Sequence, residues 1–403
     1  MTASPLNVLV VGGGVAGLEA LLALNDLAGD RVALTLLSPT REYVHRAMAV
    51  AETFSLGRAP RVPLARVASD TGAELVEGKL AEVRPDERHV ALVDGRELGY
   101  DALLLAVGGP SVPAVPHAMT WTPEAAPELL GGLLRDLEEG YGTHGVAFIV
   151  PSGVAWALPA YELALMTARQ VQGMGQHPPL FLLTPEPAPL AVFGTAASEA
   201  VAAELEAVGI AVRTHAADVE LEHSDPLTAI IEPAHERFSL SRAVALPRQL
   251  GPGLAGLPAD TRGFLRTDRL MRVEGVDRVW AAGDGADYPV KQGGLAAQQA
   301  DVAAQGIAAL AGIDLDPQPF RPLLRGRLMT GRHARWIPIG VPGGESLGDA
   351  AARALWWPPA KVAARYLAPY LVNLEGPAEL DREPEGGTAV EVTLSDEGTP
   401  ESS

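Results

Sequence analysis

The N-terminal segment places a glycine-rich turn directly after an apolar strand and at the start of a helix. Residues 6–37 read as a strand, a turn, an amphipathic helix and a second strand. Gly12, Gly14 and Gly17 in the turn match the spacing G-x-G-x-x-G. Gly12 permits the tight turn, Gly14 lets the backbone approach a pyrophosphate, and Gly17 allows close packing of helix on strand. This feature predicts a doubly wound α/β sheet that binds a dinucleotide.

The residues around this turn are candidates for cofactor binding. The helix begins at Val15 and Ala16, and a helix N-terminus carries free N–H groups and a partial positive charge that attract a phosphate. The second strand ends at Ser38 rather than at the acid that usually holds a ribose, and Arg41 follows. A serine hydroxyl can make one hydrogen bond, so we expect a weaker ribose contact at Ser38.

The middle of the chain repeats this plan with a turn that is unsuited to phosphate. Residues 146–208 predict a second strand–turn–helix–strand–helix unit, whose first turn reads PSGVAWALP. Pro151 and Pro159 lack an N–H group, and Trp156 is too bulky for the backbone to lie against a pyrophosphate. Tight binding of a nicotinamide nucleotide in the usual pose is therefore disfavoured.

The composition excludes several classes of function. The chain of 403 residues has no cysteine, which excludes disulfides, thiolate nucleophiles and thiolate-ligated metal centres. Its net charge of −19 argues against a nucleic-acid partner, because such partners bind clustered lysine and arginine. No apolar run reaches the roughly 20 residues of a spanning helix, and strand-like sequence from Leu6 leaves no room for a secretory signal. We therefore expect a cytoplasmic protein.

Three further stretches, taken with the N-terminal turn, resemble the two-dinucleotide-binding-domain flavoproteins, in the branch of sulfide:quinone oxidoreductases and type II NADH dehydrogenases. They read YDALLLAVGG (100–109), GFLRTD (263–268) and RVWAAGDGADYPVKQGGLAAQQADVAA (278–304). The resemblance covers roughly residues 6–315. It implies FAD as the cofactor and two Rossmann-like doubly wound domains, in which an inserted NAD-type domain, here degenerate, splits the FAD domain.

The resemblance and the composition divide the chain into five parts. An FAD-binding domain is expected at residues 1–115 and 242–315, with an inserted NAD(P)-type domain at 116–241. Residues 316–373 are expected to form a C-terminal membrane or dimer region, and 374–403 a disordered acidic tail. After Leu374 the chain has nine acidic residues and one arginine, which leaves too little apolar surface to offset the entropy of ordering.

The resemblance also assigns residues to the cofactor. Asp284, after Gly283, stands where the family places a carboxylate against the ribityl or pyrophosphate region, and the end of a strand is where ligands of α/β sheets gather. An aspartate at that position can also cap a helix or form a turn. The remaining residues assigned to FAD binding are Leu80, Ala106, Val107, Gly108, Gln292, Gly293 and Ala296.

Lys291 is the candidate catalytic residue. It resembles the lysine that many sulfide:quinone oxidoreductases place near flavin and quinone, where an ammonium stabilises negative charge developing on an oxygen. Residues 293–299 resemble the acceptor motif of type II dehydrogenases, and Glu162 stands where those enzymes carry a glutamate. The alternative for Lys291 is an ordinary lysine at a helix entry. Only three of the 31 basic residues are lysines: Lys79, Lys291 and Lys361.

The C-terminal segment 354–372 concentrates aromatic and basic residues. Tryptophan and tyrosine suit a membrane–water interface, and basic groups suit anionic lipid, so one alternative is peripheral contact with the inner face of the cell membrane. The other is a helix packed on the flavin domain or in a homodimer interface. The residues concerned are Trp356, Trp357, Lys361, Arg365, Tyr366 and Tyr370.

The chain lacks a hallmark of each family branch, because it has neither a second glycine turn nor a cysteine. Our leading hypothesis is an FAD-dependent oxidoreductase that passes electrons from an unidentified donor to a quinone without a cysteine relay. One alternative is an NAD(P)H:quinone oxidoreductase in which Glu186 holds the ribose. Another is a low-turnover flavoprotein that serves as a redox sensor.

Overall fold

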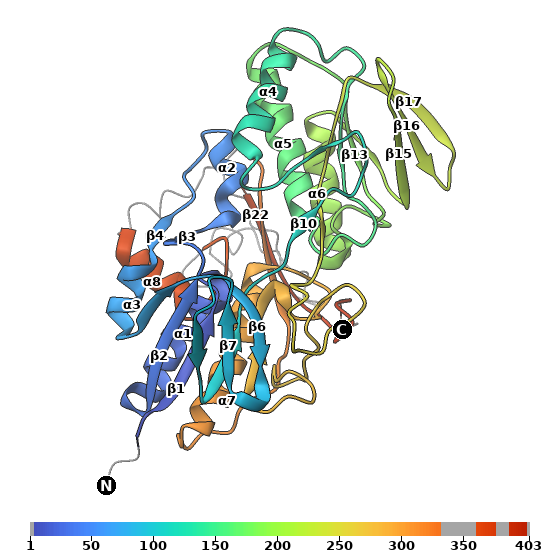
Figure 1. Ribbon diagram of the computed structural model, residues 1–403. Coiled ribbons are helices and arrows are strands. Elements are labelled where there is room, and N and C mark those ends of the chain that lie inside the picture. The colour runs from blue at the N-terminus through green and yellow to red at the C-terminus, as the bar shows by residue number, and fades with distance from the viewer. Residues whose placement is uncertain (1–3, 332–359, 376–386, 401–403) are drawn as a thin grey trace, which may run out of the picture.

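The structure is built around two parallel five-stranded sheets (Figure 1). This computed structural model describes residues 4–331, 360–375 and 387–400. The strand orders are β20–β9–β1–β2–β5 and β11–β18–β12–β13–β14. In each sheet the central strand, β1 or β12, has later strands of the chain on both sides, as in doubly wound folds, and the second sheet has the earlier strand β11 at one edge. The predicted pair of Rossmann-like domains is confirmed.

The first sheet belongs to a domain made from two separate parts of the chain, blue to teal and orange in Figure 1. Val8 and Val10 of β1 face helices α1 and α7, whereas Leu9 and Val11 face a small three-stranded sheet. A strand buried on both faces needs this uninterrupted run of apolar residues. The strands in sheet order are Val279–Ala281 (β20), Ala102–Leu105 (β9), Leu6–Val11 (β1), Val32–Ser38 (β2) and Glu74–Glu77 (β5). The covering elements are α1 (Val15–Ala28), α7 (Gly293–Leu310), β6 (Leu80–Arg84), β7 (His89–Leu92) and β8 (Glu97–Gly99).

The second sheet forms the inserted domain, green and yellow in Figure 1. Its strands in sheet order are Met119–Thr120 (β11), Arg242–Ala245 (β18), Val146–Ile149 (β12), Leu180–Leu183 (β13) and Ile210–Arg213 (β14). Its helices are α4 (Ala126–Glu138), α5 (Leu158–Gly173) and α6 (Thr195–Ala207). Because β18 pairs with β12, this sheet extends beyond the boundary predicted at residue 241.

Short elements connect and extend the two domains. The ribbon of β10 and β19 lies at the crossing between them, and the sheet β15–β16–β17 projects from the inserted domain (Figure 1). The strands are Glu42–Val44 (β3), Arg61–Pro63 (β4), Ser111–Val112 (β10), Asp218–Glu222 (β15), Leu227–Glu232 (β16), Glu236–Leu240 (β17) and Arg248–Gln249 (β19). The short helices are α2 (Ala49–Thr53), α3 (Leu64–Thr71) and the 3-10 turns Gly29–Arg31, Arg46–Met48, Pro85–Glu87, Ala191–Phe193 and Gly283–Gly285.

The acidic tail is ordered where the structure describes it, so the prediction of a disordered tail after residue 374 is wrong for that part. Strand β22 (Gly387–Thr393) pairs antiparallel with β21 (Leu323–Met329). Leu394 follows and is 1% exposed. The prediction rested on the composition of the whole tail, which gives no sign of a short segment that forms a strand. The backbone groups of that segment pair with the edge of an upstream strand.

Helix α8 (Leu367–Glu375) is docked on α1 through a buried carboxylate. Glu19 of α1 is fully buried and accepts hydrogen bonds from the backbone N–H groups of Tyr366 (2.9 Å) and Leu367 (2.6 Å). The first N–H groups of a helix have no partner within the helix, so this carboxylate satisfies them. The alternative of a helix packed on the flavin-type domain therefore holds for the described part of the C-terminal segment.

The hydroxyl groups of two tyrosines near α8 are also bound within the chain. Tyr366 donates to Asp26 (3.3 Å), and Tyr370 donates to Asp70 (2.8 Å). Within the described ranges, no helix is long and apolar enough to cross a membrane. The two other aromatic residues of the membrane prediction lie outside the described residues: Trp356 and Trp357.

Asp301 of α7 lies beside Glu19 and forms a buried carboxyl pair with it. Burial, and then the negative charge of Glu19, raise the pKa of Asp301 to about 8, while Arg365 opposes this shift. Burial also raises the pKa of Glu19, against the hydrogen bonds from Tyr366 and Leu367. Such a pair holds a proton at neutral pH, because two adjacent buried charges repel each other.

This carboxyl pair should make the stability fall as the pH rises. The folded pKa of Asp301, about 8, lies above its ordinary value of 3.8, so the folded protein holds a proton that the unfolded chain releases. The free energy of unfolding should therefore fall between about pH 4 and about pH 8. Asp301→Asn should remove part of this slope and be more stable than the parent above about pH 8. Urea unfolding across this range measures it, with the exposed Asp314→Asn as control, and an unchanged slope in Asp301→Asn would contradict it.

Candidate active site

A cavity of about 890 Å³ lies where the two domains and the C-terminal segment meet. Its wall includes the glycine turn after β1, the segment 282–284 after β20 and the turn 154–159 of the inserted domain. Lys361 and Val362 of the C-terminal segment complete it. The carboxyl ends of parallel strands are where open α/β sheets bind ligands, so this cavity is the candidate site.

The three glycines of the fingerprint have separate structural roles. Gly12 has a φ of +117°, and a Cβ there would lie 2.2 Å from the carbonyl oxygen of Ala106. A Cβ on Gly17 would lie 1.8 Å from the carbonyl oxygen of Gly12, so Gly17 lets α1 approach β1. A Cβ on Gly14 would meet no atom within 4 Å, and Gly14 lines the cavity. Gly14 thus leaves space for a phosphate at the N-terminus of α1, which no side chain caps.

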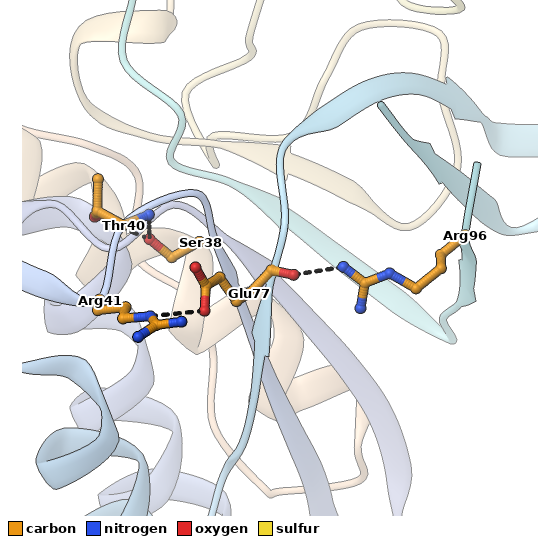
Figure 2. Close-up of polar contacts among 5 residues, drawn as sticks. All are labelled: Ser38, Thr40, Arg41, Glu77 and Arg96. Carbon is orange, nitrogen blue, oxygen red and sulfur yellow. Dashed lines mark hydrogen bonds and ion pairs between the residues drawn. The ribbon is translucent and has the colours of Figure 1, made fainter. Parts of the chain in front are cut away.

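The cavity gathers most of the predicted site residues. Gly17 lies instead in the contact between α1 and β1. Arg41 is also away from the cavity wall, because its side chain is 81% exposed and pairs with Glu77 at 2.9 Å (Figure 2). The predicted residues that line the cavity are Gly12, Gly14, Val15, Ala16, Ser38, Leu80, Ala106, Val107, Gly108, Gly283, Asp284, Lys291, Gln292, Gly293 and Ala296.

Ser38 is buried at the end of β2, and its hydroxyl already has a partner. Figure 2 shows the Ser38 oxygen accepting a hydrogen bond from the backbone N–H of Thr40, at 3.2 Å. On the other side of Glu77, Arg96 donates to its backbone carbonyl oxygen (Figure 2). These contacts hold the edge of the cavity next to β5, and the ribose contact of Ser38 stays a prediction.

Asp284 is held at the end of β20 by amide side chains. The amide of Gln249 donates to its carboxylate at 3.4 Å, and the side chain of Gln299 accepts the N–H of Gly283 at 2.8 Å. Burial raises the pKa of Asp284, while Lys291 opposes this shift. Gln299, which the sequence analysis did not assign to the cofactor site, fixes the backbone that presents the carboxylate.

Lys291 is a buried cation at the entry to α7. It is 7% exposed, donates to the carbonyl oxygen of Ala286 and lies 4.1 Å from the ring centroid of Phe264. Burial lowers the pKa of Lys291 to about 8, against the attraction of Asp284 and Asp287. A partly desolvated ammonium of this kind acts strongly on charge that develops in the cavity.

Lys361 and Glu162 form a buried ion pair in the cavity wall, so Lys361 does not face a membrane as the sequence hypothesis placed it. Their side chains are 7% and 2% exposed. The carboxylate of Glu162 also accepts the N–H of Met329 at 2.8 Å, and Lys361 donates to the carbonyl oxygen of Arg327. Burial raises the pKa of Glu162 and lowers that of Lys361, while their mutual attraction opposes both shifts.

All three lysines of the chain therefore line one cavity, since Lys79 lies in the wall with Lys291 and Lys361. Two arginines, Arg46 and Arg327, also line this cavity, and the other arginines that the structure describes lie outside its wall. Lysine differs from arginine in that burial readily shifts its pKa into the range where it exchanges protons. The scarcity of lysine was thus the signal in the sequence that could have located Lys361.

Trp156 of the inserted domain and Gly326 of β21 both pack against Phe193 beside the cavity. Trp156 packs edge-on against Phe193, with ring centroids 5.8 Å apart. Gly326 of β21 lies against the same ring, because a Cβ there would come within 2.3 Å of Phe193. The carbonyl oxygen of Ala155 accepts the backbone N–H of Lys291 at 3.1 Å, which ties the turn to the first domain.

Glu186 is also engaged within the protein. Its carboxylate accepts hydrogen bonds from the hydroxyls of Tyr161 (2.6 Å) and Thr184 (2.8 Å). Burial raises the pKa of Glu186, and these hydrogen bonds oppose the shift. A carboxylate that is committed to two internal donors is poorly placed to hold a ribose.

Sequence comparison assigns the first part of the chain to a family. Residues 6–142 match the model of the pyridine nucleotide-disulphide oxidoreductases. This segment is a pyridine nucleotide-disulphide oxidoreductase domain. The predicted relationship to that family is therefore confirmed, and it covers β1, α1 and the glycine fingerprint.

Relatives of this flavoprotein include a sulfide-quinone reductase of Aquifex aeolicus (strain VF5), which is 29% identical over 192 residues. The match covers 45% of this chain and 43% of that protein, so the chain spans less than half the length of the relative. The solved sulfide:quinone oxidoreductase of Aquifex aeolicus superposes with a TM-score of 0.70 at 20% identity, over 79% of this chain and 80% of that one. The solved structure of NDH2 of Plasmodium falciparum superposes with a TM-score of 0.55 at 14% identity, and the match covers 70% of this chain and 64% of that one.

FAD is the cofactor of this family, and the cavity fits it. The N-terminus of α1 and Gly14 offer N–H groups and space to a pyrophosphate. Asp284 lies at the end of β20, where a carboxylate can accept hydrogen bonds from hydroxyl groups of the ribityl chain. The residues that would hold FAD therefore come from both halves of the first domain.

Gly14→Val should abolish FAD binding and leave the fold intact. The backbone of Gly14, with φ of −89° and ψ of −170°, accepts any side chain, and its Cβ would meet only open space. The valine would then occupy the place of the pyrophosphate. Flavin absorbance of the purified protein measures binding, and circular dichroism measures folding.

The matched control is Gly132→Val in α4, where a Cβ also meets no atom within 4 Å and the cavity is distant. It should keep the flavin. A Gly14→Val protein that retains stoichiometric FAD would show that the pyrophosphate lies elsewhere.

Proposed function

We propose that this protein is an FAD-dependent oxidoreductase that passes electrons from an unidentified donor to a quinone without a cysteine relay. The observation that carries the proposal is a cavity with a dinucleotide fingerprint at one end and the buried ammonium groups of Lys291 and Lys361 elsewhere in its wall. Bound FAD supplies the two-electron chemistry. The protein supplies binding, orientation and electrostatics.

The cavity wall suits a planar, mostly apolar acceptor that carries carbonyl oxygens. Val154, Trp156, Leu158 and Val362 contribute apolar surface. Negative charge grows on the oxygens of a quinone as it accepts electrons, and a partly desolvated ammonium stabilises such charge. Because Lys291 has a pKa lowered to about 8, it can also release a proton near neutral pH. The quinone in the name of the Aquifex aeolicus enzyme agrees with this acceptor.

The donor site argues against a nicotinamide nucleotide. Trp156 packs against Phe193 at the turn where a glycine loop would bind a pyrophosphate, and Glu186 is bound to internal hydroxyls. The absence of cysteine in this chain argues equally against a donor that is handled through thiols. We therefore favour a donor that reaches the cavity directly.

We further propose peripheral contact with the membrane that holds the quinone. The support is the aromatic character of the sequence at Trp356 and Trp357. Lys361 adds nothing to this part of the proposal, because it faces the cavity.

NADH should reduce the bound flavin slowly. Without a glycine turn or a free ribose-binding carboxylate, the rate should saturate only above about 1 mM NADH, the upper end of ordinary KM values. Anaerobic mixing with NADH, followed by flavin bleaching, measures this, and an artificial reductant should bleach the same flavin rapidly. Fast and saturable bleaching at micromolar NADH would establish the NAD(P)H:quinone alternative instead.

Lys291→Met should slow reoxidation of the reduced flavin by a short-chain quinone by about 100-fold, the usual effect of removing one group that stabilises developing charge. FAD binding should change little, because an ammonium aimed at developing charge acts mainly on the transition state. Stopped-flow absorbance measures the rate, and Lys291→Arg, which keeps the charge, should retain most of it. Reoxidation of Lys291→Met at the parental rate would remove Lys291 from the acceptor site.

A further inference from the structure

Tyr43 and His45 form a buried hydrogen-bonded pair in the wall of the cavity, and neither belongs to a sequence motif recognised above. Their side chains are 2% and 6% exposed, and both line the cavity. The hydroxyl of Tyr43 lies 2.6 Å from Nδ1 of His45. The rings meet edge-on, with centroids 6.0 Å apart.

The backbone fixes both residues in place. Tyr43 lies in β3 opposite Val62 of β4, and the N–H of His45 donates to the carbonyl oxygen of Pro60 at 2.9 Å. The carbonyl oxygen of His45 accepts the N–H of Met48 at 3.0 Å. The imidazole is therefore held in one position relative to the cavity.

The hydrogen bond also fixes which nitrogen of His45 carries the proton. Nδ1 is the one hydrogen-bond partner of the Tyr43 hydroxyl in the part of the chain that the structure describes. If Nδ1 held the imidazole proton, the buried hydroxyl would have no acceptor, which is costly. The hydroxyl therefore donates to Nδ1, and the proton of a neutral imidazole sits on Nε2. Nε2 has no protein partner among the described residues, so its N–H is available to a ligand in the cavity.

Burial, together with the charge of Lys361, keeps this imidazole neutral. Burial, and then the positive charge of Lys361, lower the pKa of His45 to about 4. Burial, and then the negative charge of Glu19, raise the pKa of Tyr43. The pair thus presents a neutral N–H group throughout the physiological pH range.

We propose that His45, positioned by Tyr43, donates a hydrogen bond from Nε2 to a carbonyl oxygen in the cavity that becomes more negative on reduction. The oxygen belongs either to the flavin ring or to the acceptor, and no proton leaves His45 in this role. A neutral imidazole N–H can stabilise charge that develops on an oxygen. The inference rests on the proposed function only if the oxygen belongs to the acceptor, because a hydrogen bond to the flavin ring needs no quinone.

The test compares His45→Leu, which removes the donor, with His45→Gln, which restores a neutral N–H group at the end of a side chain of similar reach. Tyr43→Phe keeps the ring but removes the hydroxyl that sets the tautomer. The exposed His177→Leu on the inserted domain is the matched control. Each variant, loaded with FAD, is titrated for its flavin reduction potential without acceptor. It is then reoxidised by a short-chain quinone and, separately, by ferricyanide, which has no carbonyl oxygen.

If the oxygen belongs to the acceptor, His45→Leu should slow quinone reoxidation by about 100-fold with ferricyanide unaffected, as for loss of a charge-stabilising donor. If it belongs to the flavin, the potential should become more negative and both acceptors should respond. In either case His45→Gln should recover most of the effect, and Tyr43→Phe should lie between His45→Leu and the parent.

The proposal is overturned if His45→Leu, or Tyr43→Phe where His45→Leu fails to fold, leaves both the potential and the quinone rate unchanged. It is also overturned if His45→Gln behaves like His45→Leu while both retain FAD. A parent protein that does not react with quinone would refute the proposed function, and the potential measurement would still decide the role of His45.

Discussion

Two buried carboxylates hold the C-terminal segment that forms one side of the cavity. Glu19 of the first domain binds the backbone at Tyr366 and Leu367, and Glu162 of the inserted domain binds Lys361. A short stretch of C-terminal chain is thereby fastened to both domains, and it forms part of the cavity wall. Removing one partner of a buried polar interaction exposes the other to the full cost of burial without compensation. The shape of the site therefore depends on contacts that the C-terminal segment makes with both domains.

Local patterns in the sequence were enough to predict the cradle for the cofactor. The spacing of Gly12, Gly14 and Gly17 predicts a tight turn between a strand and a helix. The structure has this turn, with no room for a side chain at Gly12 or Gly17. Lys291 was found through its scarcity and its place before α7, and the decayed second turn was visible in Pro151 and Trp156. What these residues share is that a short stretch of sequence around each of them carries the pattern.

The features that the sequence did not reveal depend on pairing over long separations. Lys361 meets a carboxylate 199 positions earlier, so an amphipathic pattern of aromatic and basic residues gave the wrong environment for it. Strand β22 forms because it pairs with the edge of β21. The net charge of the tail gives no sign of this pairing. Glu186 stands at the position expected for a ribose contact, but its carboxylate accepts hydrogen bonds from the hydroxyls of Tyr161 and Thr184 instead.

The origin of the cavity wall in the last part of the chain has a consequence for biosynthesis. The glycine fingerprint leaves the ribosome early, but Lys361 and Val362 are among the later residues to emerge. Until they do, Glu19 and Glu162 lack the hydrogen bonds that the C-terminal segment donates to them, and the cavity lacks one side. Formation of an enclosed flavin site therefore has to follow translation of residues 361 and 362, about 350 positions after the glycine fingerprint.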